Sequence, residues 1–142
     1  MRFEFATATQ IVFGPGVLRD AGKLAKTWGR RALVVTGGDA ARAEPLLKVF
    51  AAEGIAATTF AVSHEPSVDT VMQGLAAARA MGGGAGAEFV VGIGGGSVID
   101  TAKAIAGLLA NPGDPLDYLE VVGAGKPLDR RPARAGFRRS DK

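Results

Sequence analysis

The sequence predicts an α/β fold: an open, mostly parallel, doubly wound sheet of the Rossmann type with helices on both faces. Two apolar runs, residues 32–36 and 88–93, lack any polar alternation, which is typical of strands buried on both faces. Segments with apolar residues spaced three and four apart lie between the strand-like runs. The 21 glycines cluster at the ends of these runs, where the chain must turn. This alternation of strand and helix is the pattern of a doubly wound α/β sheet.

In the first half of the chain, two short strand-like pieces at residues 3–5 and 10–14 are expected to form an edge hairpin. The apolar spacing then predicts a helix over residues 17–28, with Gly29 just past its end. A strand over residues 32–36 follows. The composition of residues 40–53 favours a helix with Pro45 in its first turn, closed by Gly54.

The second half repeats the rhythm. We expect a strand over residues 58–62 and a helix over 68–81, with Ser67 or Asp69 as its N-cap. The glycine-rich residues 82–86 are expected to form a flexible connector. A buried strand over 88–93 and a helix over 97–109 come next, and a last short helical piece is expected at 116–121.

Composition limits the class of protein. A chain of 142 residues with 47% apolar and 22% charged residues supports one compact domain with a real core. The absence of cysteine excludes disulfides and thiolate metal sites. There is no signal-like start and no apolar run of membrane-spanning length. A cytoplasmic protein with no membrane partner is therefore expected.

The basic charge belongs to the end of the chain. Residues 129–142 hold six Lys and Arg against two Asp, a net charge of +4, whereas the whole chain carries +3. Residues 1–128 are therefore close to neutral, so no nucleic-acid partner is expected. We expect an α/β domain over residues 1–128 and a basic, disordered tail over 129–142. A weaker alternative is that this tail binds nucleic acid with steep salt dependence.

The residues most indicative of a binding site follow the end of the strand over 88–93. Gly94, Gly95 and Gly96 follow it directly, and a helix starts at once near Ser97. Glycines leave backbone N–H groups open to an oxyanion, and a helix N-terminus adds unpaired donors and partial positive charge. The turn therefore predicts a phosphate or pyrophosphate site at the carboxyl end of the sheet. The alternative is a tight turn that needs glycine for packing alone. The spacing of a P-loop is not present.

Two side chains at this turn have competing explanations. Ser97 and Asp100 match a capping box, which would explain both without any ligand. In the functional alternative, Ser97 contacts a phosphate and Asp100 faces the ribose or nicotinamide of a dinucleotide. Lys103 is expected to pair with Asp100 across one helical turn.

Residues 94–103, Gly-Gly-Gly-Ser-Val-Ile-Asp-Thr-Ala-Lys, resemble the GGGSxxDxAK motif of the iron-containing alcohol dehydrogenase family. The resemblance extends over residues 1–128, through Ile-Val-Phe-Gly-Pro-Gly at 11–16, the strand at 32–36 and the turn Glu-Pro-Ser at 65–67. It implies an NAD- or NADP-dependent dehydrogenase acting on a small alcohol or aldehyde. Glycerol dehydrogenases and maleylacetate reductases share this domain plan, and the serine after the three glycines favours the alcohol dehydrogenases.

The resemblance also implies roles for residues outside the triple glycine. Pro66 and Ser67 correspond to a turn near the cofactor, and Gly37 corresponds to a position that faces the adenosine ribose. Many members carry Asp at that position, where its carboxylate repels a 2′-phosphate. Glycine removes this repulsion and permits NADP, whereas Asp39, two residues on, could restore the preference for NAD. The choice between NAD and NADP stays open.

The family's metal has no predicted ligands in this chain. Members hold a divalent metal, iron or in some cases zinc, with one Asp and several His of a C-terminal helical domain. We expect that domain to be absent here, and the one histidine, His64, to be an exposed loop residue. From residue 129 the sequence departs from the family and becomes rich in arginine, which favours a truncated or frameshifted frame over a functional basic tail.

Two hypotheses therefore stand. The chain is the cofactor-binding half of a dehydrogenase, completed in a homodimer or by a second polypeptide that carries the metal domain. Alternatively, it is a non-catalytic nucleotide-binding fragment. The identity of the substrate cannot be derived from these residues.

Overall fold

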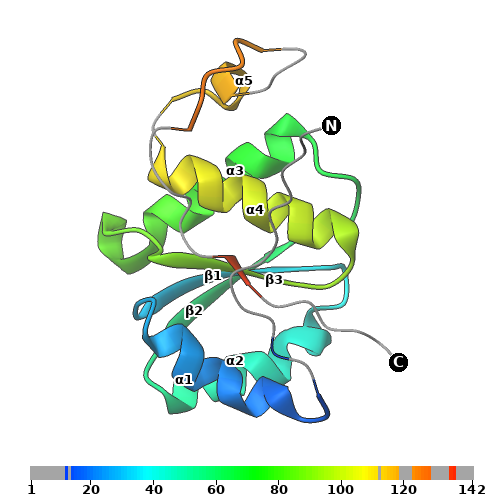
Figure 1. Cartoon of the computed structure of the whole chain (residues 1–142), viewed down its shortest axis with the longest axis vertical. Helices are drawn as coiled ribbons and strands as arrows, with labels where there is room; N and C mark the ends of the chain where they lie inside the picture. Colours follow the sequence, from blue (N-terminus) through cyan, green and yellow to red (C-terminus); the bar gives the residue numbers. More distant parts are fainter. Residues whose placement is uncertain (1–11, 13, 112, 119–122, 129–134, 137–142) are drawn as a thin grey trace, which may run out of the picture.

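The protein folds as a sheet between two layers of helices (Figure 1). The computed structural model describes residues 12, 14–111, 113–118, 123–128 and 135–136. With η for a 3-10 helix, the order of elements is η1 (Val17–Asp20), α1 (Ala21–Lys26), β1 (Arg31–Thr36), η2 (Ala40–Ala43), α2 (Glu44–Ala52), β2 (Ala56–Ala61), α3 (Val68–Ala80), η3 (Met81–Gly84), β3 (Phe89–Ile93), α4 (Gly96–Ala110), α5 (Pro115–Tyr118) and β4 (Ala135–Gly136). The predicted alternation of strands and helices is confirmed. The hairpin expected before residue 15 lies largely outside the described residues.

The sheet has the strand order β2-β1-β3-β4, and all neighbouring pairs are parallel. The chain leaves β1 for β2 on one side and then returns past β1 to β3 on the other. Since parallel crossovers are right-handed, these two connections lie on opposite faces of the sheet. The predicted open, doubly wound sheet is therefore confirmed, and its direction reverses between β1 and β3.

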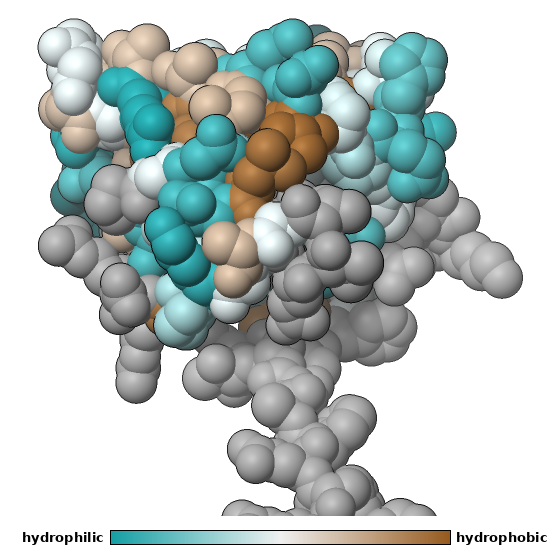
Figure 2. Space-filling model, turned by 90° about the horizontal axis from the view of Figure 1, so that it is seen from above, coloured by the Kyte–Doolittle hydropathy of each residue, from teal (hydrophilic) through white to brown (hydrophobic). Residues whose placement is uncertain are grey.

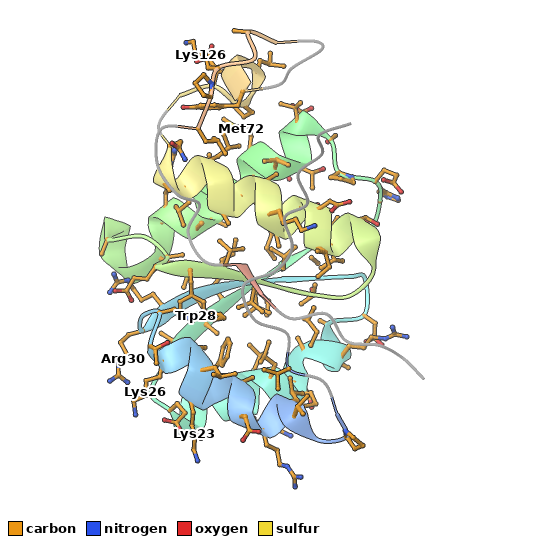
Figure 3. All side chains as sticks on the ribbon, in the orientation of Figure 1. Lys23, Lys26, Trp28, Arg30, Met72 and Lys126 are labelled. Atoms are coloured by element: carbon orange, nitrogen blue, oxygen red, sulfur yellow. The ribbon has the colours of Figure 1, made fainter. Side chains whose placement is uncertain are left out.

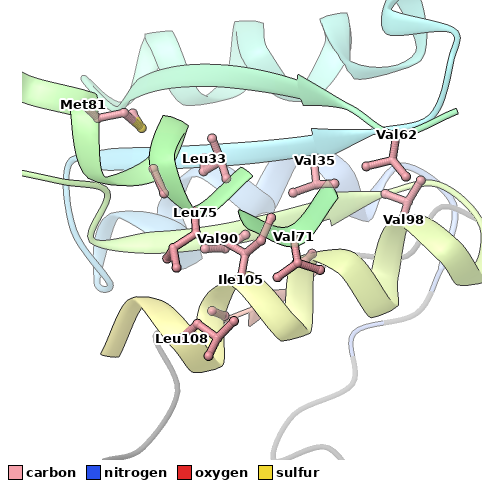
Figure 4. Packing of buried hydrophobic residues seen from close by; sticks show 13 residues of the cluster. Leu33, Val35, Val62, Val71, Leu75, Met81, Val90, Val98, Ile105 and Leu108 are labelled. Carbon is pink, nitrogen blue, oxygen red and sulfur yellow. The ribbon is translucent and has the colours of Figure 1, made fainter. Parts of the chain in front are cut away.

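Each face of the sheet packs against its own pair of helices. Along β1, Leu33 and Val35 point to one side, and Ala32 and Val34 to the other, as the pleat requires. The first pair packs with α3 and α4, where Val98 lies near Val35 and Val62 (Figure 4). The second pair packs with residues of α1 and α2. Because both faces are covered, β3 is buried at every residue, which explains its unbroken apolar sequence.

Aromatic rings fill much of the α1–α2 side. Phe89 of β3 meets the ring edges of Trp28 and Phe50, at centroid distances of 5.8 and 6.0 Å. In Figure 3, Trp28 lies between α1 and the sheet, whereas Lys23 and Lys26 point away from it. Helix α1 therefore presents its apolar face to the core and its lysines to solvent, as the predicted spacing requires.

On the α3–α4 side, hydrophobic atoms appear at the surface between hydrophilic ones (Figure 2). The large apolar side chains of Val68 and Met72 on α3 are exposed, and so is Leu116 on α5. Among the described residues, no helix is both long and apolar enough to cross a membrane.

The connector at residues 82–86 is an ordered turn in place of the flexible link that was expected. Gly82 and Gly83 take left-handed conformations inside η3, and the Gly86 amide donates to the Met81 carbonyl at 2.9 Å. Glycine is needed here because positive φ angles are costly for residues with a Cβ. The same composition that suggested flexibility therefore builds a tight reversal.

The expectation of a disordered tail over residues 129–142 is wrong for Ala135 and Gly136. These two residues form β4 and pair in parallel with Val90 and Val91 of β3. A buried strand has backbone donors and acceptors that need partners on both sides, and β4 supplies them to β3. Pairing of this kind is made by backbone groups, which every residue carries, so the sequence offers no apolar pattern that predicts it. The other residues of 129–142 lie outside the described part of the chain.

The amino ends of β1 and β3 are joined by Glu88. Its carboxylate accepts hydrogen bonds from the backbone N–H groups of Arg30 and Arg31, at 2.6 and 3.0 Å, and lies 3.4 Å from the Arg31 guanidinium. The hydrogen bond from Arg30 and the charge of Arg31 lower the pKa of Glu88, against an opposing effect of burial. The contacts of Glu88 therefore lie at the opposite end of the sheet from the glycines that follow β1 and β3.

Candidate functional site

Two glycine-rich turns meet at the carboxyl ends of β1 and β3. Thr36 and Ile93 are partners in the register of the two strands, so Gly37 and Gly94 follow side by side. From here β1 leads towards α2 on one face, and β3 leads into α4 on the other, at the right of the sheet in Figure 1. In open α/β sheets, ligands bind outside the strand ends at this reversal of direction. We call these two turns, residues 37–39 and 94–97, the switch-point turns.

The switch-point turns share one buried side chain beneath them. A Cβ built on Gly37 would lie 3.9 Å from Val98 Cγ2, and one built on Gly94 would lie 2.9 Å from the same atom. Val98 itself is 4% exposed. The sequence does not reveal this role of Val98, because the convergence of the two turns on it depends on the pairing of β1 with β3.

The glycines of the second turn differ in what they are needed for. Gly94 has a packing reason, since a Cβ there would press on Val98. Gly95 and Gly96 have none: in the described part of the chain, a Cβ on either would meet no heavy atom within 4 Å, and neither has a positive φ. The explanation by packing alone therefore accounts for Gly94 and fails for Gly95 and Gly96. Both of these residues are exposed.

Helix α4 begins at this turn with its first amides open. Its N-cap is Gly95, and no side chain among the described residues makes a capping hydrogen bond there. Within the helix, the first closed bond runs from the Ile99 amide to the Gly95 carbonyl, at 3.1 Å. The N–H groups before Ile99 point out of the end of the helix. Because α4 has 15 residues, its dipole gives this end a partial positive charge. An uncapped N-terminus beside bare glycines suits an anion.

The capping box proposed for Ser97 and Asp100 is wrong. That box requires Ser97 at the N-cap, but the helix starts at Gly96, so Ser97 already lies in the first turn. Its carbonyl accepts a hydrogen bond from the Thr101 hydroxyl at 2.7 Å. Asp100 is exposed and pairs with Lys103 at 3.5 Å, which confirms the predicted pairing across one helical turn. Ser97, half-buried beside the open amides, is thereby left without a capping task.

The turn after β1 carries a charged pair. Asp39 is the N-cap of η2, where its Oδ1 accepts from the Ala41 amide at 3.1 Å. Its Oδ2 lies 3.5 Å from Arg42 Nε, and both side chains are largely exposed. Sequence reasoning singled out Asp39 and missed Arg42, although the spacing of three residues between opposite charges was an available signal.

Pro66 and Ser67 lie after β2, one strand beyond β1. Of the two predicted N-caps, Ser67 and Asp69, Ser67 caps α3, and its Oγ accepts from the Thr70 amide at 3.1 Å. The end of β2 is tied to the sheet because the Val62 amide donates to the Thr36 carbonyl at 2.8 Å. The structure therefore brings Gly37 and residues 94–98 together, and it puts Pro66 and Ser67 on the same edge, across β1 from Gly94.

Thr36 is a buried polar residue that sequence reasoning did not single out. It is 1% exposed, and among the described residues its hydroxyl has no hydrogen-bond partner. By the alternation of β1 it belongs to the face of Ala32 and Val34, on the side of α1 and α2. It therefore does not point towards the start of α4 on the other face.

The described residues do not fit a metal ion. Among them, no group of three or more His, Asp or Glu side chains stands close enough to hold one. His64 is exposed in the loop after β2. The chemistry that the site offers is the binding of an anionic group by backbone amides, and no step through a metal is derived from these residues.

Comparison with known proteins identifies the family that this chain matches. The family model described as iron-containing alcohol dehydrogenase matches residues 8–135, which includes the first residue of β4. Among curated proteins, the chain is 35% identical over 122 residues to a sulfoacetaldehyde reductase of Bilophila wadsworthia. It is 32% identical over 122 residues to the NADH-dependent butanol dehydrogenase B of Clostridium acetobutylicum. Each match covers 82% of this chain and 30% of the relative.

A solved structure agrees with the fold. The NADH-dependent butanol dehydrogenase A of Thermotoga maritima superposes with a TM-score of 0.77 at 25% identity, over 94% of this chain and 33% of that one. The chain thus spans about a third of the length of the relatives that it matches. In each relative, the chain matches one α/β part of a longer protein.

Proposed function

The chain belongs to the iron-containing alcohol dehydrogenase family, and we propose that it supplies the NAD(P)-binding half of a dehydrogenase. The whole enzyme would transfer a hydride between a small alcohol or aldehyde and the nicotinamide ring. One observation carries the proposal. Gly95 and Gly96 have no packing or backbone reason to be glycine, and they stand at the uncapped start of α4, at the switch point of the sheet. A ligand that approaches the backbone closely explains them.

In this proposal the pyrophosphate lies on residues 94–97. The open amides of the first turn of α4 and the Ser97 hydroxyl donate to its oxygens, as the helix dipole favours. The adenosine ribose lies at the other switch-point turn, beside Gly37 and Asp39. Asp100, exposed one turn into α4, faces the nicotinamide side, and Pro66 and Ser67 border the cofactor from the end of β2.

Hydride transfer needs more than these residues. A divalent metal, which the family resemblance implies, would polarise the alcohol oxygen and lower the pKa of its hydroxyl, so that the proton is lost and the hydride passes to the nicotinamide ring. Since the described residues hold no cluster of metal ligands, the task of this part of the chain is to bind and orient the cofactor. A homodimer, or a second polypeptide carrying the metal domain, would complete the site. We propose that it acts in the cytoplasm.

The second candidate is a nucleotide-binding protein without catalytic activity. The lack of a metal cluster in the described part of the chain favours it. The two candidates share the binding site and differ in turnover. Oxidation of NADH by the purified chain with butyraldehyde and added Fe²⁺ supports the enzyme, and binding without turnover supports the second candidate.

The test of the shared site is a titration of the full chain with NADH and with NADPH, followed by nicotinamide fluorescence. We expect saturable binding, and we expect Gly95→Val to abolish it while leaving the fold intact, because the new side chain points into open space. The control Ala52→Val adds bulk at the exposed end of α2 and should bind as the wild type does. No binding by the wild type overturns the proposal. Unchanged affinity in Gly95→Val means that the pyrophosphate binds elsewhere.

A further inference from the structure

Strand β2 leaves one edge of the sheet open. It lies at the end of the order β2-β1-β3-β4, and among the described residues it pairs with β1 alone. Most residues of β2 are exposed, namely Ala56, Thr58, Thr59 and Ala61. An open strand edge is a ready template for a strand of another chain. Proteins that must avoid such pairing protect the edge with charges, proline, a bulge or a very short strand.

The β2 edge has none of these protections. No charged residue and no proline occurs over residues 54–63. The register with β1 runs without interruption over all six residues of β2, so the strand has no bulge. Threonine and phenylalanine at residues 58–60 favour extended backbone. The edge is therefore suited to pairing with a further strand.

The hydrogen bonds to β1 show which backbone groups of β2 stay open. The Ala56 amide donates to the Arg30 carbonyl, and the Val62 amide donates to the Thr36 carbonyl, both at 2.8 Å. Backbone groups of successive residues alternate between the two sides of a strand, so the even-numbered residues from 56 to 62 face β1. The N–H and C=O groups that point out of the sheet edge are those of Ala57, Thr59 and Ala61.

A second β2 strand complements this edge when the two strands run antiparallel about a two-fold axis at Thr59. Thr59 then faces the partner's Thr59, and Ala57 faces the partner's Ala61, so every outward N–H and C=O group of these residues meets a partner. Between these pairs, Thr58 lies opposite the partner's Phe60. Threonine pairs and pairs of an aromatic with a β-branched residue are favoured across strands. Because the edge is uncharged, two identical edges meet without repulsion.

The flank of α2 next to this edge carries apolar side chains. Helix α2 contacts β2, and α1 lies on the other side of α2, where a Cβ on Gly22 would meet Val49 Cγ1 at 2.8 Å. Helical spacing puts Leu47 and Ala51 on the flank of α2 opposite to Val49. Leu47 is half-buried and Ala51 is exposed. Two copies joined at β2 would bring these flanks towards each other and cover apolar surface in addition to making backbone hydrogen bonds.

We propose that the β2 edge is the surface through which two copies of this chain associate. Their β2 strands pair antiparallel about a two-fold axis at Thr59 and join the two sheets into one. A contact of this kind uses the same patch on both copies and is closed, so association stops at the dimer. The inference goes beyond the proposed function and does not depend on it, because strand pairing needs no nucleotide.

Sedimentation velocity of the full chain over a range of concentrations tests for the dimer. We expect the wild type to be dimeric and Thr59→Pro to be monomeric. Proline removes the central outward N–H, and it is tolerated in an edge strand where that N–H faces solvent. Far-UV circular dichroism shows whether the variant is folded. A wild type that stays monomeric up to its solubility limit overturns the proposal, and so does a folded Thr59→Pro that remains dimeric.

Two cysteine variants locate the axis, and they test the proposal even if Thr59→Pro does not fold. The chain has no cysteine, so mild oxidation can link two copies only through the introduced thiol. The Cα atoms of a hydrogen-bonded antiparallel pair lie about 5.5 Å apart, within the reach of a disulfide, so Thr59→Cys should form a covalent dimer. Thr58→Cys is the matched control at an exposed neighbouring threonine. Its two copies are offset by about 7 Å along the strands and should stay unlinked. Equal cross-linking of both variants, or of neither, means that β2 does not pair in this way.

Discussion

Replacement of Gly94 by alanine tests whether the close packing of α4 on β3 is the reason for this glycine. The new Cβ would lie 2.9 Å from Cγ2, 3.1 Å from Cβ and 3.3 Å from Cγ1 of Val98. Rotation of the valine side chain cannot relieve this, because its Cβ does not move and its rotamer is restricted in a helix. The start of α4 must therefore shift away from the sheet.

Overpacking of this kind costs about 1–3 kcal/mol of the free energy of unfolding. At roughly 4 °C per kcal/mol for a domain of this size, the Tm of Gly94→Ala should fall by about 4–12 °C. The measurement is urea and thermal unfolding followed by far-UV circular dichroism. Gly96→Ala is the matched control, because a Cβ there meets nothing within 4 Å. It should be neutral or more stable by about 0.4–1 kcal/mol.

A second variant, Val98→Ala, shows whether Gly94→Ala is destabilising because of its contact with Val98 or because position 94 does not tolerate alanine. Val98→Ala removes the Cγ atoms at 2.9 and 3.3 Å and leaves the Cβ at 3.1 Å, so adding Gly94→Ala to it should cost less than in the wild type. The double-mutant cycle should give a favourable coupling of about 1 kcal/mol or more. If Gly94→Ala is as stable as Gly96→Ala, or if the two changes are additive, the steric argument for Gly94 is refuted.

Two further predictions concern buried and braced polar groups. Because the pKa of Glu88 is lowered in the fold, its stabilising effect is present at neutral pH and is lost as the pH falls through the folded-state pKa. In acid, the free energy of unfolding of the wild type should therefore drop towards that of Glu88→Gln. An equal pH dependence in both proteins would contradict this. Thr36→Val removes a buried hydroxyl that has no partner and nearly preserves shape, so chemical denaturation should show equal stability or a gain of up to about 1 kcal/mol. A loss of more than about 1 kcal/mol would mean that the hydroxyl is hydrogen-bonded.

Most of the elements could be predicted because their signals are local. The unbroken apolar runs of β1 and β3 and the spacing of apolar residues on α3 and α4 follow from burial alone, and all four were predicted to within two residues. Boundaries were weaker. The helix expected over residues 40–53 starts as the 3-10 turn η2, since Asp39 caps that turn before Pro45 opens α2.

The errors have two causes: the residue at which a helix starts, and contact between segments far apart in the chain. Ser97 and Asp100 matched a capping box in sequence, yet the helix starts at Gly96, so Ser97 lies in its first turn and not at the N-cap. Ala135 and Gly136 joined the sheet through backbone bonds that no composition reveals.

The sequence by itself determined the fold class, the family resemblance and the place of the glycine-rich turn, because each depends on residue types at fixed local spacing. Only the tertiary structure decided what the glycines are for. Gly94 makes room for Val98, whereas Gly95 and Gly96 face open space at an uncapped helix end. The physical reason is that the space available to a side chain depends on how near the atoms of other segments lie, and the pairing of β1 with β3 brings those segments together.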